Sequence, residues 1–189
     1  SSPIFLNSGL VNERKFLVKN VNSSASNSAK FKNKNSFSLI PSFQTNYSLP
    51  MIKETIKSRN TLTPKLSLRL STPHTKDVRR IDRKIDYNNI YDLDRLGIDD
   101  SNEGGISLTY GYEQSIVDKS SLEEKLKFGF ANNLRFEENK DLPLNSNLGD
   151  KVSDFVGALE YKPNKNFKFD YDFSLKNNLN EINYELYGF

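Results

Sequence analysis

Residues 166–176 read Asn166-Phe-Lys-Phe-Asp-Tyr-Asp-Phe-Ser-Leu-Lys176, and in this stretch every second residue is aromatic or aliphatic. The residues between them are charged or polar. A period of two over about ten residues is typical of a strand with one apolar and one polar face. A tilted membrane strand needs roughly 9–11 residues to cross the hydrocarbon, whereas strands in soluble domains commonly have about 5–6. The stretch therefore favours a strand that crosses a bilayer.

The composition of the chain agrees with a membrane barrel. Hydrophobic residues make up 35% of the 189 residues, which fits a protein with a polar interior and long polar loops. No run of about 18 apolar residues occurs, so the sequence excludes a transmembrane helix. A net charge of +3 is too small to indicate a nucleic-acid partner. No cysteine nucleophile, Gly-x-Ser-x-Gly elbow or Walker-type glycine loop occurs, so the sequence predicts neither an enzyme nor a cofactor site.

The same alternation recurs along the chain and predicts an all-β fold, an antiparallel up-and-down transmembrane β-barrel. The expected strands are residues 37–51, 62–71, 106–112, 122–136, 155–161, 166–176 and 182–186. An odd number of strands leaves an edge unpaired, so we expect a partial barrel, about seven strands of a larger one. Short and long connections tend to alternate, as they do in outer-membrane barrels, where the short ones face the periplasm.

Two regions of the chain differ in composition. Residues 1–35 contain a Ser/Asn-rich patch, which predicts a mobile loop with possible strand ends at residues 4–6 and 16–18. Residues 36–189 form the predicted barrel domain. Within it Pro41 lacks a backbone N–H, so we expect its strand to be bent or locally loose there.

The alternation also assigns side chains to the two faces of the barrel wall. The residues predicted to meet lipid are Leu66, Leu68, Leu70, Phe128, Phe130, Phe169, Tyr171 and Phe173. The residues predicted to line the lumen are Lys65, Arg69, Lys125, Lys127, Lys168, Asp170 and Asp172. A lumen with charges of both signs suits a hydrated sugar or a polar plug.

The last residues, Tyr187-Gly-Phe189, invite comparison with the aromatic ending of many outer-membrane barrels. The apolar register of the last strand is Ile182, Tyr184 and Leu186, which leaves Phe189 on the opposite face. A sequence cut in mid-barrel explains this register better.

The most distinctive text runs from Ile81 to Gly111, between two predicted strands. It resembles the signature of the LptD (OstA) family of lipopolysaccharide-assembly proteins. That signature has an Asn-Leu-Phe-x-Leu-Asn-Arg-Phe-x-Gly-x-Asp segment, then an acidic–Gly element and a strand ending in Tyr-Gly. The matching residues are Asn89, Ile90, Tyr91, Leu93, Asp94, Arg95, Leu96, Gly97, Asp99, Glu103, Gly104, Tyr110 and Gly111. The resemblance covers roughly residues 60–189, and none is identified in the first 35 residues.

The resemblance implies a non-enzymatic translocon in the outer membrane of a Gram-negative bacterium. Lipopolysaccharide would arrive from periplasmic bridge proteins, its sugars would pass through the lumen, and its acyl chains would enter the outer leaflet through a lateral seam. The implied partners are lipopolysaccharide, an LptE-like lipoprotein plug and the bridge proteins, with no cofactor. Two alternatives remain open from the residues: another outer-membrane barrel (a porin, receptor channel or adhesin) or a soluble β-sandwich binding module.

Charged residues in the connection between residues 72 and 104 admit two interpretations. Arg95 and the acidic residues around it either pin a folded loop by ion pairs or are ordinary solvated charges. A basic cluster either meets the phosphates of surface lipopolysaccharide or belongs to a solvated loop, and the acidic residues that interrupt it favour the loop. This cluster consists of Lys76, Arg79, Arg80, Arg83 and Lys84.

Three smaller features of this connection complete the predictions. Gly104-Gly105 predicts a tight turn or a bulge before the next strand. His74 is the only histidine, so we expect no metal site around it. The spacing of Asp99, Asp100 and Glu103 matches no EF-hand loop, so no calcium site is predicted there either.

Overall fold

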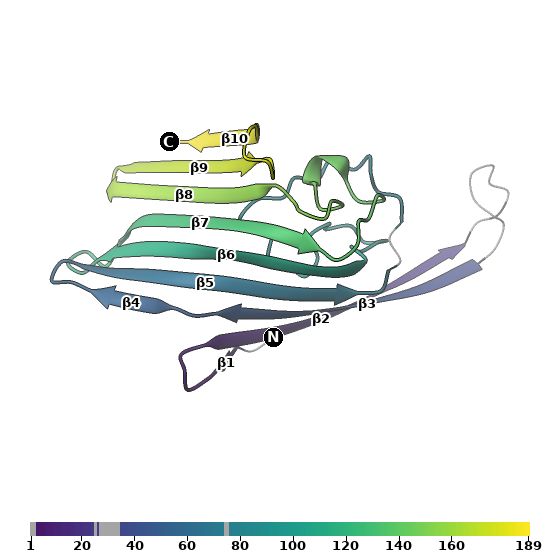
Figure 1. Cartoon of the computed structure of the whole chain (residues 1–189), viewed down its shortest axis with the longest axis horizontal. Coiled ribbons are helices and arrows are strands. Elements are labelled where there is room, and N and C mark those ends of the chain that lie inside the picture. Colours follow the sequence, from purple (N-terminus) through teal and green to yellow (C-terminus); the bar gives the residue numbers. More distant parts are fainter. Residues whose placement is uncertain (1–2, 25, 27–34, 74–75) are drawn as a thin grey trace.

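The computed structural model describes residues 3–24, 26, 35–73 and 76–189, and these form a single antiparallel sheet (Figure 1). Its strands are β1 (Ile4–Phe5), β2 (Val11–Ser24), β3 (Asn35–Ser48), β4 (Met51–Glu54), β5 (Ser58–Ser71), β6 (Gly105–Asp118), β7 (Glu124–Arg135), β8 (Phe155–Asn164), β9 (Phe167–Leu175) and β10 (Ile182–Gly188). They follow the order β1-β2-β3-β5-β6-β7-β8-β9-β10, with β4 paired to β5. The two ends of this order do not pair with each other, so the sheet is open, as a partial barrel wall would be.

Ten strands occur among the described residues, where the alternation predicted about seven. The additional ones are β4, together with β1 and β2 in the region where we expected a loop with short strand ends. The outer side of β2 carries only two large apolar residues, Phe16 and Val18, so the sequence gives a weak signal there. Backbone pairing compensates, because β2 pairs with β3 along its whole length, from Val11 opposite Ser48 to Ser24 opposite Asn35.

β6 is also longer than predicted, since it runs to Asp118 instead of ending at residue 112. Gln114 interrupts the apolar alternation on the outer face, but it and its neighbour Glu113 both have partners on β5. The Glu113 carboxylate accepts from Lys65 at 2.9 Å, and the Gln114 amide donates to Asn60 at 3.3 Å. Cross-strand polar pairs of this kind continue a strand where the hydrophobic pattern stops.

Pro41 does not loosen the pairing of β3 with β2, contrary to our expectation. The strand is continuous from Asn35 to Ser48, and Pro41 pairs with Val18 of β2. The backbone carbonyl of Pro41 accepts from Thr72 on the β5 side, so the missing N–H faces that side and costs the β2–β3 ladder nothing. Pairing between β3 and β5 begins one residue later, at Ser42.

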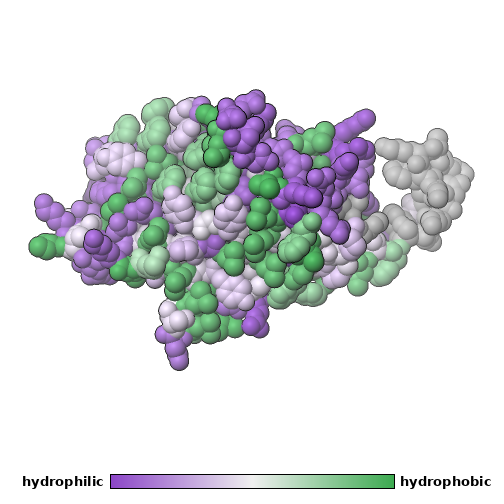
Figure 2. All heavy atoms as spheres, in the orientation of Figure 1, coloured by the Kyte–Doolittle hydropathy of each residue, from purple (hydrophilic) through white to green (hydrophobic). Residues whose placement is uncertain are grey.

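The sheet has two chemically different faces. We call inner the face that residues 76–104 cover, and outer the opposite one. Large hydrophobic side chains remain exposed on the outer face, as with Leu66 at 41% and Phe16 at 70%. In Figure 2 hydrophobic side chains (green) lie over the strands, and hydrophilic ones (purple) gather toward both ends of the strands. No helix among the described residues is long and apolar enough to span a membrane.

The connections differ in length at the two ends of the strands. At one end they are short, residues 119–123 between β6 and β7 and residues 165–166 between β8 and β9. The opposite end carries residues 72–104 and 136–154, and the second of these contains a short 3-10 helix, Leu144–Ser146. Both long connections fold back against the inner face, where they build a small apolar core. This core consists of Val78, Ile85, Tyr87, Ile90, Leu96, Leu142 and Leu148, packed on Ala131 and Val156 of the sheet.

The register of the last strand corrects the face assigned to Tyr187 and Phe189. A register shift between Ile182 and Tyr184 changes the alternation of β10. Tyr187 therefore pairs with Tyr171 and stacks on it, with ring centroids 4.9 Å apart. Phe189 lies beside Phe169, with centroids 5.4 Å apart, so both terminal aromatic rings lie on the outer face.

Candidate functional site

A buried cluster of charges joins the connection 76–104, hereafter the inner loop, to the sheet. Arg95 and Glu103 lie at its centre, 1% and 0% exposed. The Arg95 guanidinium donates from Nε to Glu103 Oε2 at 2.8 Å and from Nη2 to Oε1 at 2.5 Å. A two-point pair of this kind fixes the relative orientation of the two groups. Of the two interpretations of Arg95, the structure therefore favours the loop pinned by ion pairs.

Two further arginines, both from strands, complete the cluster. Arg135 of β7 donates to Glu103 Oε1 at 2.5 Å and also to the carbonyl of Gly104. Arg69 of β5 donates to the Glu103 carbonyl at 2.6 Å and to that of Leu93 at 3.0 Å. Arg69 donates to two carbonyls of the inner loop and Arg135 to one, so strands β5 and β7 hold the loop backbone directly.

Neutral side chains of the sheet complete the hydrogen bonding of Arg95. Its Nη1 donates to Asn133 Oδ1 at 2.8 Å, and its Nη2 donates to Ser107 Oγ at 2.9 Å. Both partners are buried on the inner face of β7 and β6. A buried guanidinium is tolerated only when its donors are satisfied, and here strand residues satisfy them.

The protonation state of Glu103 follows from its neighbours. Burial by itself would raise the pKa of this carboxyl, but the positive charges of Arg95, Arg69 and Arg135 outweigh it and bring the pKa to about 2. Glu103 is therefore ionised at any physiological pH. A buried carboxylate surrounded by guanidinium groups is a lasting electrostatic link between loop and sheet.

Local turn chemistry shapes the inner loop so that Arg95 reaches this position. The Asp86 carboxylate accepts from the backbone N–H of Asn88 and of Asn89, and Asp94 Oδ1 accepts from the N–H of Gly97. Gly97 has a φ of +63° and Gly105 a φ of +94°, conformations that side chains rarely adopt. Of the glycine pair for which a turn or bulge was predicted, Gly105 has the positive φ and begins β6, and a Cβ there would lie 2.9 Å from Arg135 Nη2.

The inner loop is also tied to strands near both ends of the sheet. Lys19 of β2 pairs with Asp94 at 2.6 Å and donates to the carbonyl of Ser101 at 3.0 Å. At the other end, the Tyr184 hydroxyl of β10 donates to the carbonyl of Ile85 at 3.0 Å. The ammonium of Lys84 lies 5.4 Å from the centroid of the Tyr184 ring. The loop therefore spans the inner face from β2 to β10.

Two tyrosines of the loop pack against glycines of the sheet. The Tyr87 ring lies so close to Gly129 that a Cβ there would stand 2.1 Å from the ring, and the Tyr91 hydroxyl similarly approaches Gly111. Burial raises the pKa of both tyrosines well above the ordinary value, with the charge of Glu113 adding to the effect. Both hydroxyls stay protonated, and that of Tyr87 donates to Glu113 at 3.2 Å.

Toward the short turns the inner face stays open and polar. A hollow of about 320 Å³ lies beside Tyr87 and Tyr91, bounded by residues that include Lys15, Lys65 and Glu113. Charges of both signs are paired around it, as in Lys65 with Glu113 at 2.9 Å and Lys15 with Glu13 at 3.3 Å. The wall offers hydrogen-bonding groups of both kinds without a large net charge.

Apart from Lys125, which lies at the register shift of β7, the residues predicted to line the lumen come from inner-face positions of their strands. Arg69 and Lys65 contact the inner loop directly, and Lys127 pairs with Glu113 at 3.7 Å. Lys168, Asp170 and Asp172 border a second hollow beside Tyr87. Lys125 precedes Lys127 by two residues on β7 and pairs with Glu123 at 2.6 Å. The residues predicted to meet lipid occupy the alternate positions on β5, β7 and β9, which face outward.

The structure divides the signature residues into groups with different positions. Leu93, Asp94, Arg95, Glu103 and Gly104 contact strand residues through the bonds described above. Asn89 and Gly97 shape the loop, Asp99 is exposed, Tyr110 faces outward from β6, and Gly111 lies beneath Tyr91. Only part of the signature therefore contributes to the buried cluster.

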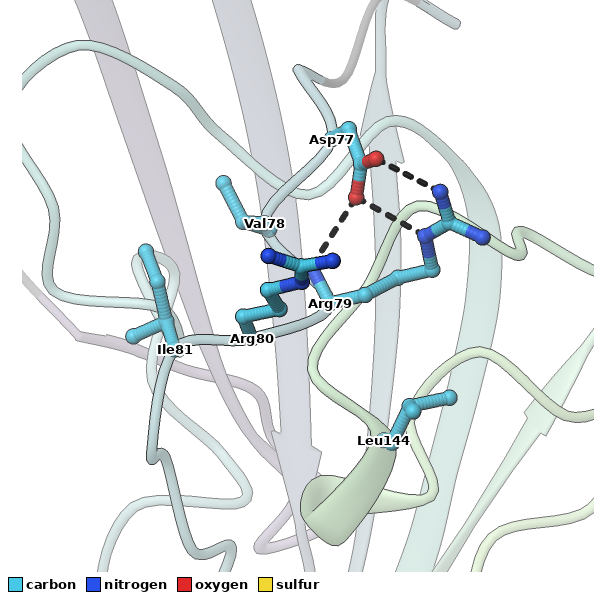
Figure 3. Close-up of a pocket in the computed structure, with 6 residues that line it drawn as sticks. All are labelled: Asp77, Val78, Arg79, Arg80, Ile81 and Leu144. Atoms are coloured by element: carbon cyan, nitrogen blue, oxygen red, sulfur yellow. Dashed lines mark hydrogen bonds and ion pairs between the residues drawn. The ribbon is translucent and has the colours of Figure 1, made fainter.

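Most of the basic cluster interacts within the protein. Arg79 forms a two-point pair with Asp77, at 2.6 and 2.9 Å, beside Leu144 (Figure 3). Lys76 pairs with Asp100 at 2.9 Å, and Arg83 donates to the carbonyl of Arg95 at 2.7 Å. These bonds hold part of the cluster within the loop, and the preference for a solvated loop over phosphate contact stays a prediction.

No metal site is apparent where the sequence offered acidic residues. Asp100 is bonded to Lys76 and Glu103 to the arginines, so the three acidic residues of this segment do not converge. The described residues contain no group of three or more potential metal ligands. His74 lies outside the described residues.

Sequence reasoning missed several residues of the site. Arg135 and Asn133 lie at the end of a strand in which apolar residues drew attention, and Lys19 lies in the expected N-terminal loop. Tyr87 and Tyr184 carried no marker in the sequence. Alternation with Lys127 does predict that Arg135 lies on the polar face of its strand, but it gives no sign of the contact with Glu103.

Long antiparallel strands, an apolar outer face and a polar inner face covered by inward-folded loops together define the wall of an outer-membrane β-barrel. Comparison with protein families gives the particular one. Residues 7–188 match the model of LptD, LPS transport system D, and because nearly the whole chain is matched, it belongs to that family. The match extends the resemblance from residue 60 back to residue 7 and includes β2. Comparison with curated proteins gives no match.

Members of this family are components of lipopolysaccharide transport and assembly in the outer membrane. The family therefore selects among the alternatives left open by the residues, against a porin, receptor channel or adhesin and against a soluble sandwich.

Proposed function

We propose that this chain forms part of the wall of a translocon that inserts lipopolysaccharide into the outer leaflet of the Gram-negative outer membrane. The observation that carries the proposal is the inner loop, which covers the inner face from β2 to β10 near the long connections. Toward the short turns, which face the periplasm in such barrels, the polar inner face stays open. The arrangement suits a polar cargo that enters from the periplasm.

The two faces suit the two parts of lipopolysaccharide. Its sugars would be hydrated along Lys65, Lys127, Lys168 and the acidic residues between them. Its acyl chains would remain outside, level with the outer-face residues. Because the inner loop obstructs the far end, cargo must leave sideways or the loop must move. The lateral seam implied by the family would provide the first route, and its strands are not identified in this chain.

The partners follow from the family. Lipopolysaccharide is the cargo, periplasmic bridge proteins deliver it, and an LptE-like lipoprotein would fill the lumen from the periplasmic side. The hollows beside Tyr87 offer such a plug a lining of paired charges and polar side chains. The proposal includes no catalytic step and no cofactor.

A depletion experiment tests the proposed function. Cells whose own copy of the full-length gene can be shut off should lose newly made lipopolysaccharide from their surface and accumulate it in the inner membrane. A plasmid copy should restore delivery, measured by pulse labelling and by an outer-leaflet enzyme that modifies lipid A. An unchanged distribution of lipopolysaccharide after shut-off would refute the proposal.

The assignment of faces has its own test. Single cysteines in place of Lys127 and Phe128 should differ in reaction with a small water-soluble thiol reagent, because the first side chain faces water and the second hydrocarbon. We expect labelling at 127 and little at 128, with the parent protein as the background. Equal labelling at both positions would contradict the assignment.

A further inference from the structure

The β2–β3 hairpin projects beyond the strands beside it. β3 pairs with β5 only from Ser42 to Ser48, so its residues 35–41 pair with β2 alone. Residues 18–24 and 35–41 therefore form a two-stranded ribbon, which extends past the end of β5 on the side of the long connections (Figure 1). A ribbon in this position would ordinarily be assigned to an extracellular loop.

The two sides of this ribbon differ as the two faces of the sheet do. On the outer side Phe37, Leu39 and Val18 are 69%, 53% and 41% exposed. On the inner side Ile40 is only 2% exposed, and Lys19 binds Asp94 of the inner loop. Asn20 and Asn22 of β2 share the outer side, so the apolar residues there belong mainly to β3. Around Lys19 and Ile40, the inner side of the ribbon therefore lies against the inner loop, as the inner face of the other strands does.

The apolar band on the outer face does not run straight across the strands. Following the paired residues from β9, Tyr171 is level with Leu159, Phe128 and Gln114, and finally with Leu62 on β5. The outward leucines at 66, 68 and 70 lie further toward the long connections. On β3 the outward residues Phe43, Leu39 and Phe37 continue the shift, since Phe43 pairs with Leu70. The band therefore climbs steadily from β9 to β3.

The slope of this band agrees with the tilt of membrane strands. Between Tyr171 and Phe43 the band climbs by the separation of Leu62 and Leu70, or roughly 26 Å at about 3.3 Å per residue. Five steps between strands at about 4.8 Å amount to roughly 24 Å sideways. The slope is close to 45°, and strands of outer-membrane barrels tilt by about 35–45°.

The geometry points to a bilayer whose plane crosses the sheet along this slope. Residues 18–22 and 37–41 of the β2–β3 ribbon then belong to the barrel wall. We propose that Phe37 and Leu39 contact the acyl chains of the outer leaflet. This inference rests on the proposed function for the presence of a bilayer. It adds that lipid contact on β3 continues from Tyr47 back to Phe37, about ten residues, although β5 ends opposite Ser42.

Photocrosslinking in cells tests this contact. Benzoylphenylalanine is introduced in the full-length gene product at Phe37, Leu39 or Ser38, or at Phe128 as the reference. We expect lipid acyl-chain adducts at 37 and 39 within about threefold of the yield at 128, as measured by mass spectrometry. Ser38 lies between them on the inner side and should give at least fivefold less.

The outcomes separate this inference from the proposed function. Lipid adducts at 128 without adducts at 37 and 39, or with protein adducts there instead, would overturn the inference and leave the barrel wall intact. Absence of lipid adducts at 128 as well would refute the membrane wall itself. Leu39→Arg provides a second measurement. It should lower the amount of assembled protein, since residue 39 meets hydrocarbon, and an unchanged amount would mean that the residue meets water.

Discussion

Glu103 is in contact with Arg69, Arg95 and Arg135 at the same time. Removing its charge leaves three buried guanidinium groups without a counterion, and breaking a buried pair commonly costs about 3–5 kcal/mol. We expect Glu103→Gln to lower stability by about this amount and to make the inner loop cleavable, as measured by urea unfolding and limited proteolysis. Asp77→Asn removes an exposed partner of Arg79 and should leave both unchanged. Equal effects of the two substitutions would contradict the role of the buried cluster.

The lowered pKa of Glu103 predicts how the loop responds to acid. The folded pKa of about 2 lies below the ordinary value of about 4.3. The stabilisation is therefore complete above about pH 4.3 and is lost as the pH falls toward 2. Hydrogen exchange of the loop amides, corrected for intrinsic rates, should be constant from pH 5 to 8 and rise below pH 4. Glu103→Gln should abolish the step, and a step near pH 6 would be incompatible with this assignment.

Close packing also holds the inner loop on the sheet, as the contact between Tyr87 and Gly129 shows. A Cβ at this position would lie 2.1 Å from the Tyr87 ring, so Gly129→Ala must displace the ring. Overpacking of this kind typically costs about 1–3 kcal/mol. In the variant that also carries Tyr87→Ser the ring is gone, and the alanine should then have little further effect. Additive losses in a double-mutant cycle would show that Tyr87 does not cause the requirement for glycine.

At the scale of elements, alternation predicted the strands with a regular apolar face, and it failed where both faces are polar. The pattern was clear in β9 and the second half of β5 because one face of each strand is apolar and the other polar. β2 has two large apolar residues on its outer side, and its pairing with β3 is a backbone property that no residue pattern records. Besides the apolar residues of its small core, the inner loop buries Arg95, Asn102 and Glu103, which the sequence pattern marks only as polar. Their partners are distant in sequence, as Arg95 and Asn133 are.

The inner loop should also depend on its tether to β2. Lys19 is the only described residue of that strand that donates to the loop carbonyls Ile98 and Ser101. Lys19→Met keeps the length of the side chain and removes the three-way contact with Asp94 and those carbonyls. We expect faster hydrogen exchange in residues 94–101 and unchanged exchange near Ile85, which Tyr184 holds separately. Uniform loosening of the whole loop would mean that the two tethers are not independent.

At the scale of the molecule, the sequence predicted the barrel class and the family. The assignment of the faces of β5, β7 and β9 to lipid and lumen stays a prediction. It could not predict how much of the inner face is covered, because that depends on long connections folding back. Arg69 was expected to meet water in the lumen, yet it is 3% exposed and bonded to loop carbonyls. Period-two patterns distinguish the two faces of a strand, and they carry no information about what lies against each.

If the outer face contacts lipid, substitutions on the outer and inner faces should differ in their effect on assembly of the protein in the membrane. Phe128 and Phe169 lie on the outer face within the apolar band, so Phe128→Arg or Phe169→Arg places a charge in hydrocarbon at a cost of about 2–4 kcal/mol near the midplane. Lys127→Ser changes the inner face, whose hydrated groups can replace a lost ion pair. The amount of heat-modifiable, protease-resistant protein in the outer membrane should fall for both arginine variants and stay at the parent level for Lys127→Ser. Equally harmless substitutions on both faces would mean that hydrocarbon does not contact the outer face, and both the wall and the transport proposal would then fail.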